Sequence, residues 1–204
     1  MKIGIFGGTF DPPHIGHVNA FKAFLKQFDF DRVFVIPVLL PPHKSLKSSV
    51  SADDRLEMTR LAFEGLADCV TVSDLEIKRQ GKSYTADTIK YFKEQGYDDI
   101  YFLCGTDMIL TLDLWYKPEY IMANAKIVYA RRENEEENTV RISEKINSYR
   151  KRFGAEVIEL NSPVLEISST DIRQSISEGK SEYLSQEVMG YIEEKGLYKD
   201  RRIL

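Results

Sequence analysis

Several features are scarce in this chain of 204 residues, and each scarcity narrows what the chain can be. The two cysteines, Cys69 and Cys104, lie far apart in apolar surroundings and lack the spacing of a metal site. We expect them to be buried free thiols in a reducing cytoplasm. No apolar run is long enough to cross a bilayer, and the N-terminus enters a predicted strand without a signal-peptide pattern. The sequence thus predicts a cytoplasmic chain without a membrane partner.

An excess of basic residues is also missing. The 28 Lys and Arg residues are outnumbered by 32 Asp and Glu residues, which gives a formal net charge of −4. This balance argues against sequence-independent binding of nucleic acid, which needs a basic face. Hydrophobic residues make up 43% of the chain, enough for a sizeable core, and the length favours one domain. A homo-oligomer is left open.

The most informative stretch runs from Lys2 to His17. An apolar run, short enough for one buried strand, ends at Gly7-Gly8 and leads through a proline turn to His14 and His17 at a predicted helix start. Free N–H groups and the helix dipole at such a start favour an anion, and glycines allow its close approach. The stretch has neither the P-loop spacing nor that of a dinucleotide-binding turn. It therefore predicts a phosphate site of another kind.

The rest of the chain alternates between strands and helices. Further strands are expected at 32–37, 70–72, 100–104, 126–130 and 156–160, with helices at 18–28, 52–65, 83–95, around Trp115, at 141–153, from 167 onward and at 185–195. A charged loop is expected at 131–138. This alternation predicts a Rossmann-like, doubly wound, mainly parallel sheet with helices on both faces and a C-terminal helical segment. Ligands of such sheets bind beyond the carboxyl ends of the strands. The glycine turn, Gly105-Thr106-Asp107 and Ser168-Ser169-Thr170 can converge there.

Three later segments each allow a plain and a functional interpretation. Ser168 with Asp171 fits a capping box, and the same helix start could bind phosphate with Arg173 as a charged clamp; the two are compatible. The run from Pro37 to Lys44 could be a stiff surface loop or could carry a functional lysine. Trp115 could belong to the core or, given its polar neighbours, serve as a stacking platform for a flat ring.

Taken together, these motifs resemble a known superfamily. The turn from Gly7 to His17 and the segment Ile167-Ser168-Ser169-Thr170-Asp171-Ile172-Arg173 resemble the two signatures of the nucleotidylyltransferases. Within this superfamily, the chain is similar to the nicotinate mononucleotide adenylyltransferases along nearly its whole length. The matches are the run ending in Pro41-Pro42-His43-Lys44, then Ser83-Tyr84-Thr85, Thr88, Asp107 and Trp115. The resemblance implies a single domain over 1–204, with a nucleotide-binding core at about 1–165 and a helical part at about 166–204.

The resemblance also implies a reaction in NAD biosynthesis. The 5′-phosphate of nicotinate mononucleotide would attack the α-phosphorus of ATP in line, giving deamido-NAD and pyrophosphate without a covalent enzyme intermediate. Mg²⁺ would be held through the ATP phosphates, with no metal ligands from the protein.

Residue roles follow from the same resemblance. The catalytic groups would be His14, His17, Lys44 and Arg173. ATP would be bound by Gly7, Gly8, Thr9, Phe10, His14, His17, Gly105, Asp107, Ile167, Ser168, Ser169, Thr170 and Arg173. Nicotinate mononucleotide would be bound by Gly8, Thr9, Lys44, Thr85, Trp115, Tyr116 and Arg132.

One departure and two alternatives accompany this interpretation. Relatives commonly continue with Pro-Gly after the arginine matched by Arg132, whereas Arg132 is followed here by Glu133 and an acidic run. The alternatives are another transferase of the superfamily, such as a phosphopantetheine adenylyltransferase or a cytidylyltransferase, and a nucleotide-binding regulatory module without turnover. The presence of His14, His17, Lys44 and Arg173 favours an enzyme.

Overall fold

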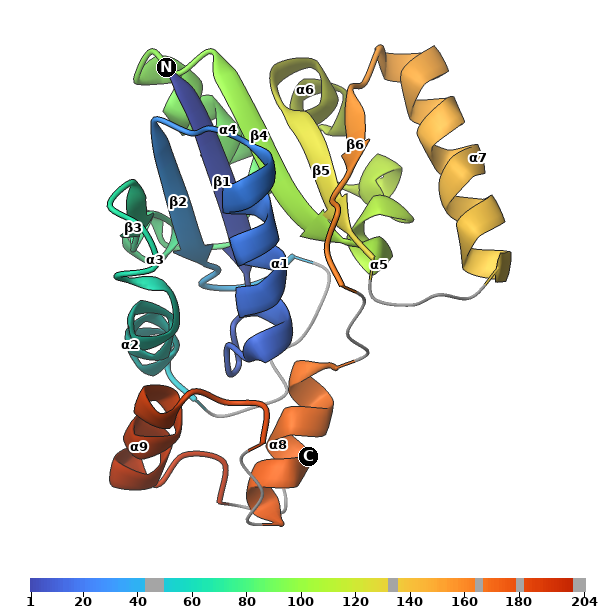
Figure 1. The fold of residues 1–204 in the computed structure, drawn as a ribbon. Coiled ribbons are helices and arrows are strands. Elements are labelled where there is room, and N and C mark those ends of the chain that lie inside the picture. Colours follow the sequence, from blue (N-terminus) through green and yellow to red (C-terminus); the bar gives the residue numbers. More distant parts are fainter. Residues whose placement is uncertain (43–49, 132–135, 164–166, 179–181, 200–204) are drawn as a thin grey trace.

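Six parallel strands form one sheet in the computed structural model, which describes residues 1–42, 50–131, 136–163, 167–178 and 182–199. The strands lie in the order β3-β2-β1-β4-β5-β6, and every neighbouring pair is parallel (Figure 1). Their bounds are Lys2–Gly8 (β1), Arg32–Pro37 (β2), Val70–Val72 (β3), Asp99–Gly105 (β4), Lys126–Ala130 (β5) and Val157–Glu159 (β6). The predicted fold class is confirmed.

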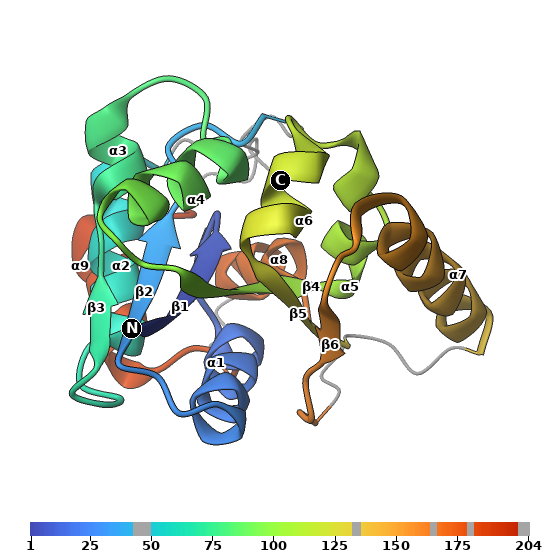
Figure 2. The ribbon, with the colours of Figure 1, turned by 90° about the horizontal axis from the view of Figure 1, so that it is seen from above.

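Helices cover both faces of this sheet (Figures 1 and 2). Those of the first half are α1 (Ile15–Gln27), α2 (Ala52–Phe63), α3 (Leu75–Arg79) and α4 (Thr85–Glu94). Those of the second half are α5 (Thr106–Ile109), the 3₁₀ turn η1 (Leu112–Leu114), α6 (Pro118–Asn124), α7 (Glu136–Phe153), α8 (Ser169–Ser177) and α9 (Gln186–Lys195). Among the described residues, no helix has both the length and the hydrophobicity that a membrane crossing requires.

The alternation of side chains along each strand supplies a core on either side of the sheet. In β4, Ile100 and Phe102 pack with α4 and α6, whereas Tyr101 and Leu103 pack with the α1 side. Both faces are apolar because both are covered, as expected for a parallel sheet. The carboxyl ends of the strands are the edge from which the connecting loops leave toward the site.

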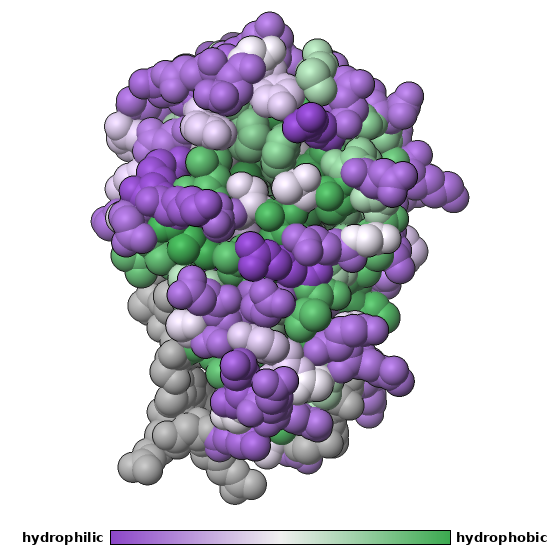
Figure 3. All heavy atoms as spheres, turned by 90° about the vertical axis from the view of Figure 1, so that its left-hand side faces the viewer, coloured by the Kyte–Doolittle hydropathy of each residue, from purple (hydrophilic) through white to green (hydrophobic). Residues whose placement is uncertain are grey.

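The C-terminal helices lie beyond that edge (Figure 1). α9 packs on α2 through a small apolar cluster that includes Met58, Val188 and Ile192. Polar residues cover much of the face that carries α2 and α9, with hydrophobic residues visible between them (Figure 3). The C-terminal part is thereby held against the strand ends, where the sequence places one wall of the phosphate site.

Several sequence predictions agree with the structure in detail. The strands at 32–37, 70–72 and 126–130 have the expected bounds. Ser51 caps α2 by accepting a hydrogen bond from the Asp54 N–H at 3.0 Å, and Gly196, with φ of +66°, ends α9 in the left-handed conformation. The strand bounds follow the short apolar runs in the sequence, and both helix ends depend on the chemistry of neighbouring residues.

Other predictions need correction. The loop expected at 131–138 is wrong in its last part, because α7 begins at Glu136, and acidic residues are favoured in the first turn of a helix. Trp115 directly follows η1 instead of lying inside a helix. Cys104 is buried as expected, but Cys69 is half-buried. α3 was not predicted from the sequence, because its five residues are too few for a periodic pattern.

Candidate active site

The strand order reverses between β1 and β4, because the chain moves outward to β2 on one side and to β5 on the other. Such a reversal opens a crevice at the carboxyl ends of the two strands. A pocket lies there, and the residues that line it include His14, His17, Cys104, Gly105 and Ile167. The structure thus brings together the opening turn, the end of β4 and the start of the Ser168 segment, as the sequence analysis expected.

The two glycines of the opening turn differ in what they permit. A Cβ on Gly8 would lie 2.7 Å from the ring of Phe10, which is buried and has φ of +47°. A Cβ on Gly7 would approach nothing closer than a Phe102 ring carbon at 3.7 Å among the described residues. A Cβ on Gly8 would therefore force the Phe10 ring or the turn to shift, whereas a Cβ on Gly7 would make only an ordinary contact with Phe102.

His14 and His17 lie together at the start of α1. Their ring centroids are 3.8 Å apart, and His14 is the residue immediately before the helix. The main-chain N–H of His14 donates to Nδ1 of His17 at 3.3 Å. A neutral imidazole that accepts at Nδ1 carries its proton at Nε2, so His17 is assigned as an Nε2–H donor without needing a positive charge.

The start of α8 combines a capping box with contacts to the opening turn. Ser168 Oγ accepts from the N–H of Asp171 at 3.2 Å, and an Asp171 oxygen accepts from the Ser168 N–H at 3.1 Å. Hydrogen bonding from Ser168 holds the pKa of Asp171 below its ordinary value. Ser169 Oγ donates to the carbonyl of Pro12 at 3.2 Å. The first helical turn is thus fixed against the residues that precede His14.

Arg173 is turned into the protein and is only 5% exposed. Its Nη1 donates to the carbonyl of Asp11 at 2.7 Å, and its Nη2 donates to Thr170 Oγ1 at 3.1 Å. The Asp11 carboxylate lies 3.7 Å from the guanidinium. The positive charge of Arg173 is therefore placed behind the opening turn, and its described contacts are made to the protein.

The end of β4 adds Gly105 and Asp107 to the site. Gly105 lines the pocket, and Asp107 is exposed in the first turn of α5. The hydroxyl of Thr106 donates to the carbonyl of Ala130 at 3.2 Å, which ties the end of β4 to the end of β5. Asp107 is thus presented to solvent from a rigid base.

A second group of predicted residues gathers beside α4. Thr85 is the first residue of α4, and the rings of Tyr84 and Tyr116 lie 4.6 Å apart, centroid to centroid. Trp115 is half-buried, its ring meets that of Phe102 edge-on, and its indole N–H donates to Thr111 Oγ1 at 3.4 Å. The structure therefore brings Thr85, Trp115 and Tyr116 into one neighbourhood, whereas Lys44 and Arg132 lie outside the described residues.

Asp113 anchors the segment that carries Trp115. Its carboxylate accepts from Lys145 Nζ at 2.9 and 3.0 Å and from the Tyr149 hydroxyl at 3.2 Å, both on α7. Burial acts to raise the pKa of Asp113, but the hydrogen bond and charge of Lys145 outweigh it and lower the pKa. In the sequence, Asp113 is only one of the polar neighbours of Trp115.

Three further residues that hold the opening turn were not predicted from the sequence. Asp11 is 3% exposed and accepts a hydrogen bond from the Tyr198 hydroxyl at 2.7 Å. Arg55 is 1% exposed and donates to the carbonyl of Thr9 at 2.9 Å. Only the Asp-Pro-Pro turn hinted at Asp11, and no local pattern marked the other two.

Comparison with known proteins defines the class first. The model of the cytidylyltransferase-like family matches residues 5–175, and the chain belongs to this family of nucleotidyltransferases. A Caldicellulosiruptor saccharolyticus protein named "Probable nicotinate-nucleotide adenylyltransferase" is 38% identical over 98% of this chain and 100% of its own length. A protein of the same name from Exiguobacterium sibiricum is 38% identical over 97% of this chain and 99% of its own length. Within its class, the chain therefore belongs to the nicotinate-nucleotide adenylyltransferases.

Solved structures agree with the fold. A structure of Plasmodium falciparum nicotinic acid mononucleotide adenylyltransferase complexed with NaAD superposes with a TM-score of 0.75. The match covers 97% of each chain at 21% sequence identity. A structure of the enzyme complexed with APC gives a TM-score of 0.74 at the same identity. At this identity the likeness concerns the fold.

Proposed function

We propose that this chain joins ATP and nicotinate mononucleotide to give deamido-NAD and pyrophosphate, as a step in NAD biosynthesis. The observation that carries the proposal is the pocket at the strand-order reversal, which His14, His17, Gly105 and Ile167 line together. Hydrogen-bond donors and a helix start at one crevice suit a polyphosphate. Full-length similarity to nicotinate-nucleotide adenylyltransferases supports the choice of the acceptor.

In this proposal the protein positions two phosphates and stabilises charge. The mononucleotide 5′-phosphate attacks the α-phosphorus of ATP, and negative charge grows on the oxygens of the phosphorus under attack. His17, an Nε2–H donor through its Nδ1 contact, stabilises that charge, and His14 supports it from the adjacent turn. Neither histidine needs to remove a proton, because the attacking phosphate is already an anion.

The departing pyrophosphate lies at the start of α8 in this scheme. The N–H groups of Ser169 and Thr170 precede the first described intrahelical bond of α8, from the Ile172 N–H to the Ser168 carbonyl at 3.1 Å. They are suited to phosphate oxygens. Arg173 stabilises the phosphates by its charge from behind the turn, because a direct contact with them would break its hydrogen bond to the Asp11 carbonyl. The substrate is MgATP, in which phosphate oxygens hold the ion.

The mononucleotide occupies the neighbourhood of Thr85, Trp115 and Tyr116. The indole of Trp115 stacks on the pyridine ring, and main-chain N–H groups at Thr85 and Tyr116 bind the nicotinate carboxylate. Donors at this position favour the acid over the amide, whose NH₂ group cannot accept. We assign Asp107 to the adenosine ribose, Lys44 to the mononucleotide phosphate and Arg132 to the mononucleotide. We also propose one domain over 1–204 and a cytoplasmic location.

Pyrophosphate release tests this function. Purified protein is incubated with MgATP and, separately, nicotinate mononucleotide, nicotinamide mononucleotide or phosphopantetheine. We expect the fastest release with nicotinate mononucleotide, together with deamido-NAD as product. Turnover with phosphopantetheine alone would assign the chain to another transferase of its class. Nucleotide binding without any release would overturn catalysis in favour of a regulatory module.

A further inference from the structure

Arg55 of α2 places a guanidinium in the protein interior behind the opening turn. It is 1% exposed and is one of the largest fully buried side chains among the described residues. Its Nη1 donates to the carbonyls of Thr9 at 2.9 Å and Val38 at 2.7 Å, and its Nη2 donates to the carbonyl of Leu39 at 3.1 Å. One planar group therefore joins the segment that follows β1 to the segment that follows β2.

The segment 38–40 is held from its other side as well. The Val38 N–H donates to the carbonyl of Gly8 at 2.9 Å, and the Leu39 N–H donates to Ser83 Oγ at 2.9 Å. The Ser83 N–H in turn donates to the carbonyl of Leu40 at 2.9 Å. Ser83 leads directly into Tyr84 and Thr85, so this segment connects the phosphate turn with the neighbourhood assigned to the mononucleotide.

Burying the guanidinium of Arg55 costs desolvation free energy, so its hydrogen-bond geometry indicates why an arginine is used here. Burial lowers the pKa of Arg55 from its ordinary value, and the charge of Asp11 acts in the opposite direction. An apolar side chain of similar volume would fill the space without desolvating a charge. A guanidinium differs in presenting several donors in a fixed plane. The position therefore favours a group that sets main-chain atoms at defined places.

We propose that Arg55 is a positioning residue for adenylyl transfer, which fixes the separation between the turn at Thr9 and the segment 38–40. This inference rests on the proposed function. Arg55 touches neither substrate in this proposal. The N–H donors of its guanidinium align the turn at Thr9, beside the ATP site, with the segment 38–40, which leads to the mononucleotide site. In-line displacement depends steeply on alignment, so losing the fork lowers kcat more than it raises either KM.

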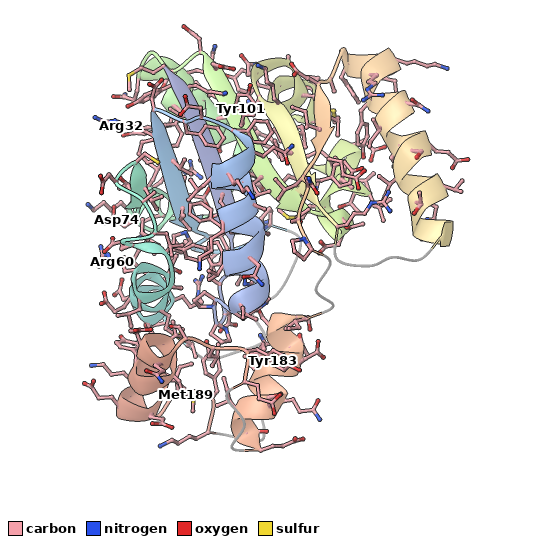
Figure 4. The ribbon with its side chains drawn as sticks, viewed as in Figure 1. Arg32, Arg60, Asp74, Tyr101, Tyr183 and Met189 are labelled. Carbon is pink, nitrogen blue, oxygen red and sulfur yellow. The ribbon has the colours of Figure 1, made fainter. Side chains whose placement is uncertain are left out.

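Three variants test this inference. Arg55→Lys keeps the charge and the stem but lacks the planar fork, and Arg55→Met keeps only the stem. The matched control is Arg60→Met on the same helix, because Arg60 projects outward (Figure 4) and pairs with Glu57 at 3.3 Å. Steady-state kcat and both KM values are measured well below the melting temperature. Amide hydrogen exchange without substrate is followed in peptides that cover 8–11 and 37–41.

We expect kcat to fall at least tenfold in Arg55→Lys and further in Arg55→Met, with each KM changed less than threefold and Arg60→Met unchanged. Exchange should rise in both peptides of the Arg55 variants. A folded Arg55→Lys with kcat within twofold of the unchanged protein overturns the inference. Failure of both Arg55 variants to fold also overturns it, because the side chain would then serve the fold alone.

Failure of the proposed function is a separate result. It appears as absence of turnover in the unchanged protein with nicotinate mononucleotide. The exchange measurement needs no substrate, so it still reports whether Arg55 fixes the two segments. Unchanged exchange in a folded Arg55→Met refutes the structural half of the inference whatever the substrate proves to be.

Discussion

The hydroxyl of Tyr198 donates to Oδ1 of Asp11 at 2.7 Å, joining residues that are 187 positions apart. Asp11 begins the proline turn before His14, and Tyr198 follows the last helix. Burial raises the pKa of Tyr198, and the Asp11 carboxylate raises it further, so the phenol stays protonated and remains a donor at neutral pH. The C-terminal end of the described chain is thereby bonded to the turn that carries the site.

Removing this one hydroxyl should destabilise the protein. Hydrogen bonds to charged groups contribute about 1.5 to 3 kcal/mol, and we expect Tyr198→Phe to lower the free energy of unfolding by a similar amount. Urea denaturation at pH 7 measures it. Tyr183→Phe is the control, because the described hydrogen bond of Tyr183 uses its main-chain carbonyl, which accepts from the Ile15 N–H at 2.9 Å. Equal stability of the two variants would show that the Tyr198 contact contributes nothing.

Alanine substitutions at Gly7 and Gly8 should differ in their effect on stability, measured by the same urea denaturation. The added Cβ in Gly8→Ala meets the Phe10 ring at 2.7 Å, so the ring or the turn must shift at a cost of about 1 to 3 kcal/mol. Gly7→Ala places its Cβ 3.7 Å from Phe102, an ordinary contact. We therefore expect a clear fall in the free energy of unfolding for Gly8→Ala only. A Gly7→Ala variant that loses as much stability would contradict the steric argument.

Local chemistry explains which parts of this molecule the sequence predicts. The strand 32–37 and the Ser168 cap involve neighbouring residues, so their patterns are visible in a short window. Convergence of the glycine turn, Gly105 and the Ser168 segment was also predictable, because parallel strands end at one edge.

The contacts that hold the opening turn join residues far apart in the sequence, so no short window reveals them. An arginine at position 55 has the same appearance in the sequence whether it faces solvent or the interior, and its acceptors are 16 to 46 residues away. Asp11, the hydrogen-bond partner of Tyr198, is 187 positions away in the sequence. Only the assembled fold identifies these pairs, whereas the ligand contacts assigned to His17, Trp115 and their neighbours remain predictions.

Trp115 should act on the affinity for the mononucleotide. Stacking of a base on an aromatic side chain contributes about 1 to 3 kcal/mol by alanine substitution, so Trp115→Ala should raise that KM at least about fivefold while kcat changes little. Leu114→Ala is the control, because Leu114 is adjacent and 73% exposed. Initial rates at saturating ATP give both constants. An unchanged KM in a folded Trp115→Ala protein would exclude the stacking role.

Asp113 should stabilise the protein in a pH-dependent way. Its pKa in the folded protein is lowered, so its contribution is present above the ordinary carboxylate pKa and is lost as the pH falls through the folded value. We expect Asp113→Asn to lower the free energy of unfolding by about 1.5 to 3 kcal/mol at pH 7. The difference should shrink below about pH 4.

Urea titrations between pH 3 and about pH 8 follow this difference, within the range where carboxylates titrate. Asp98→Asn is the matched control, since the side chain of Asp98 is 84% exposed although it also pairs with a lysine. No measurable loss is expected there, because exposed pairs contribute little. A difference for Asp113→Asn that is constant across the pH range would show that its charge is not the stabilising feature.

The assigned tautomer of His17 gives the sharpest test of the site. Nδ1 accepts from the His14 N–H at 3.3 Å, so the catalytic donor in our proposal is the N–H at Nε2. The amide nitrogen of glutamine can reach the position of Nε2, whereas that of asparagine reaches only the position of Nδ1. Loss of one donor to a developing anion lowers kcat by roughly 10²- to 10³-fold. We expect this loss in His17→Asn and at least a tenfold smaller one in His17→Gln, measured as pyrophosphate release at saturating substrates. Circular dichroism controls for folding. Equal activity of the two variants would contradict the Nε2 assignment, and a His17→Asn protein that is more active than His17→Gln would assign the donor to Nδ1.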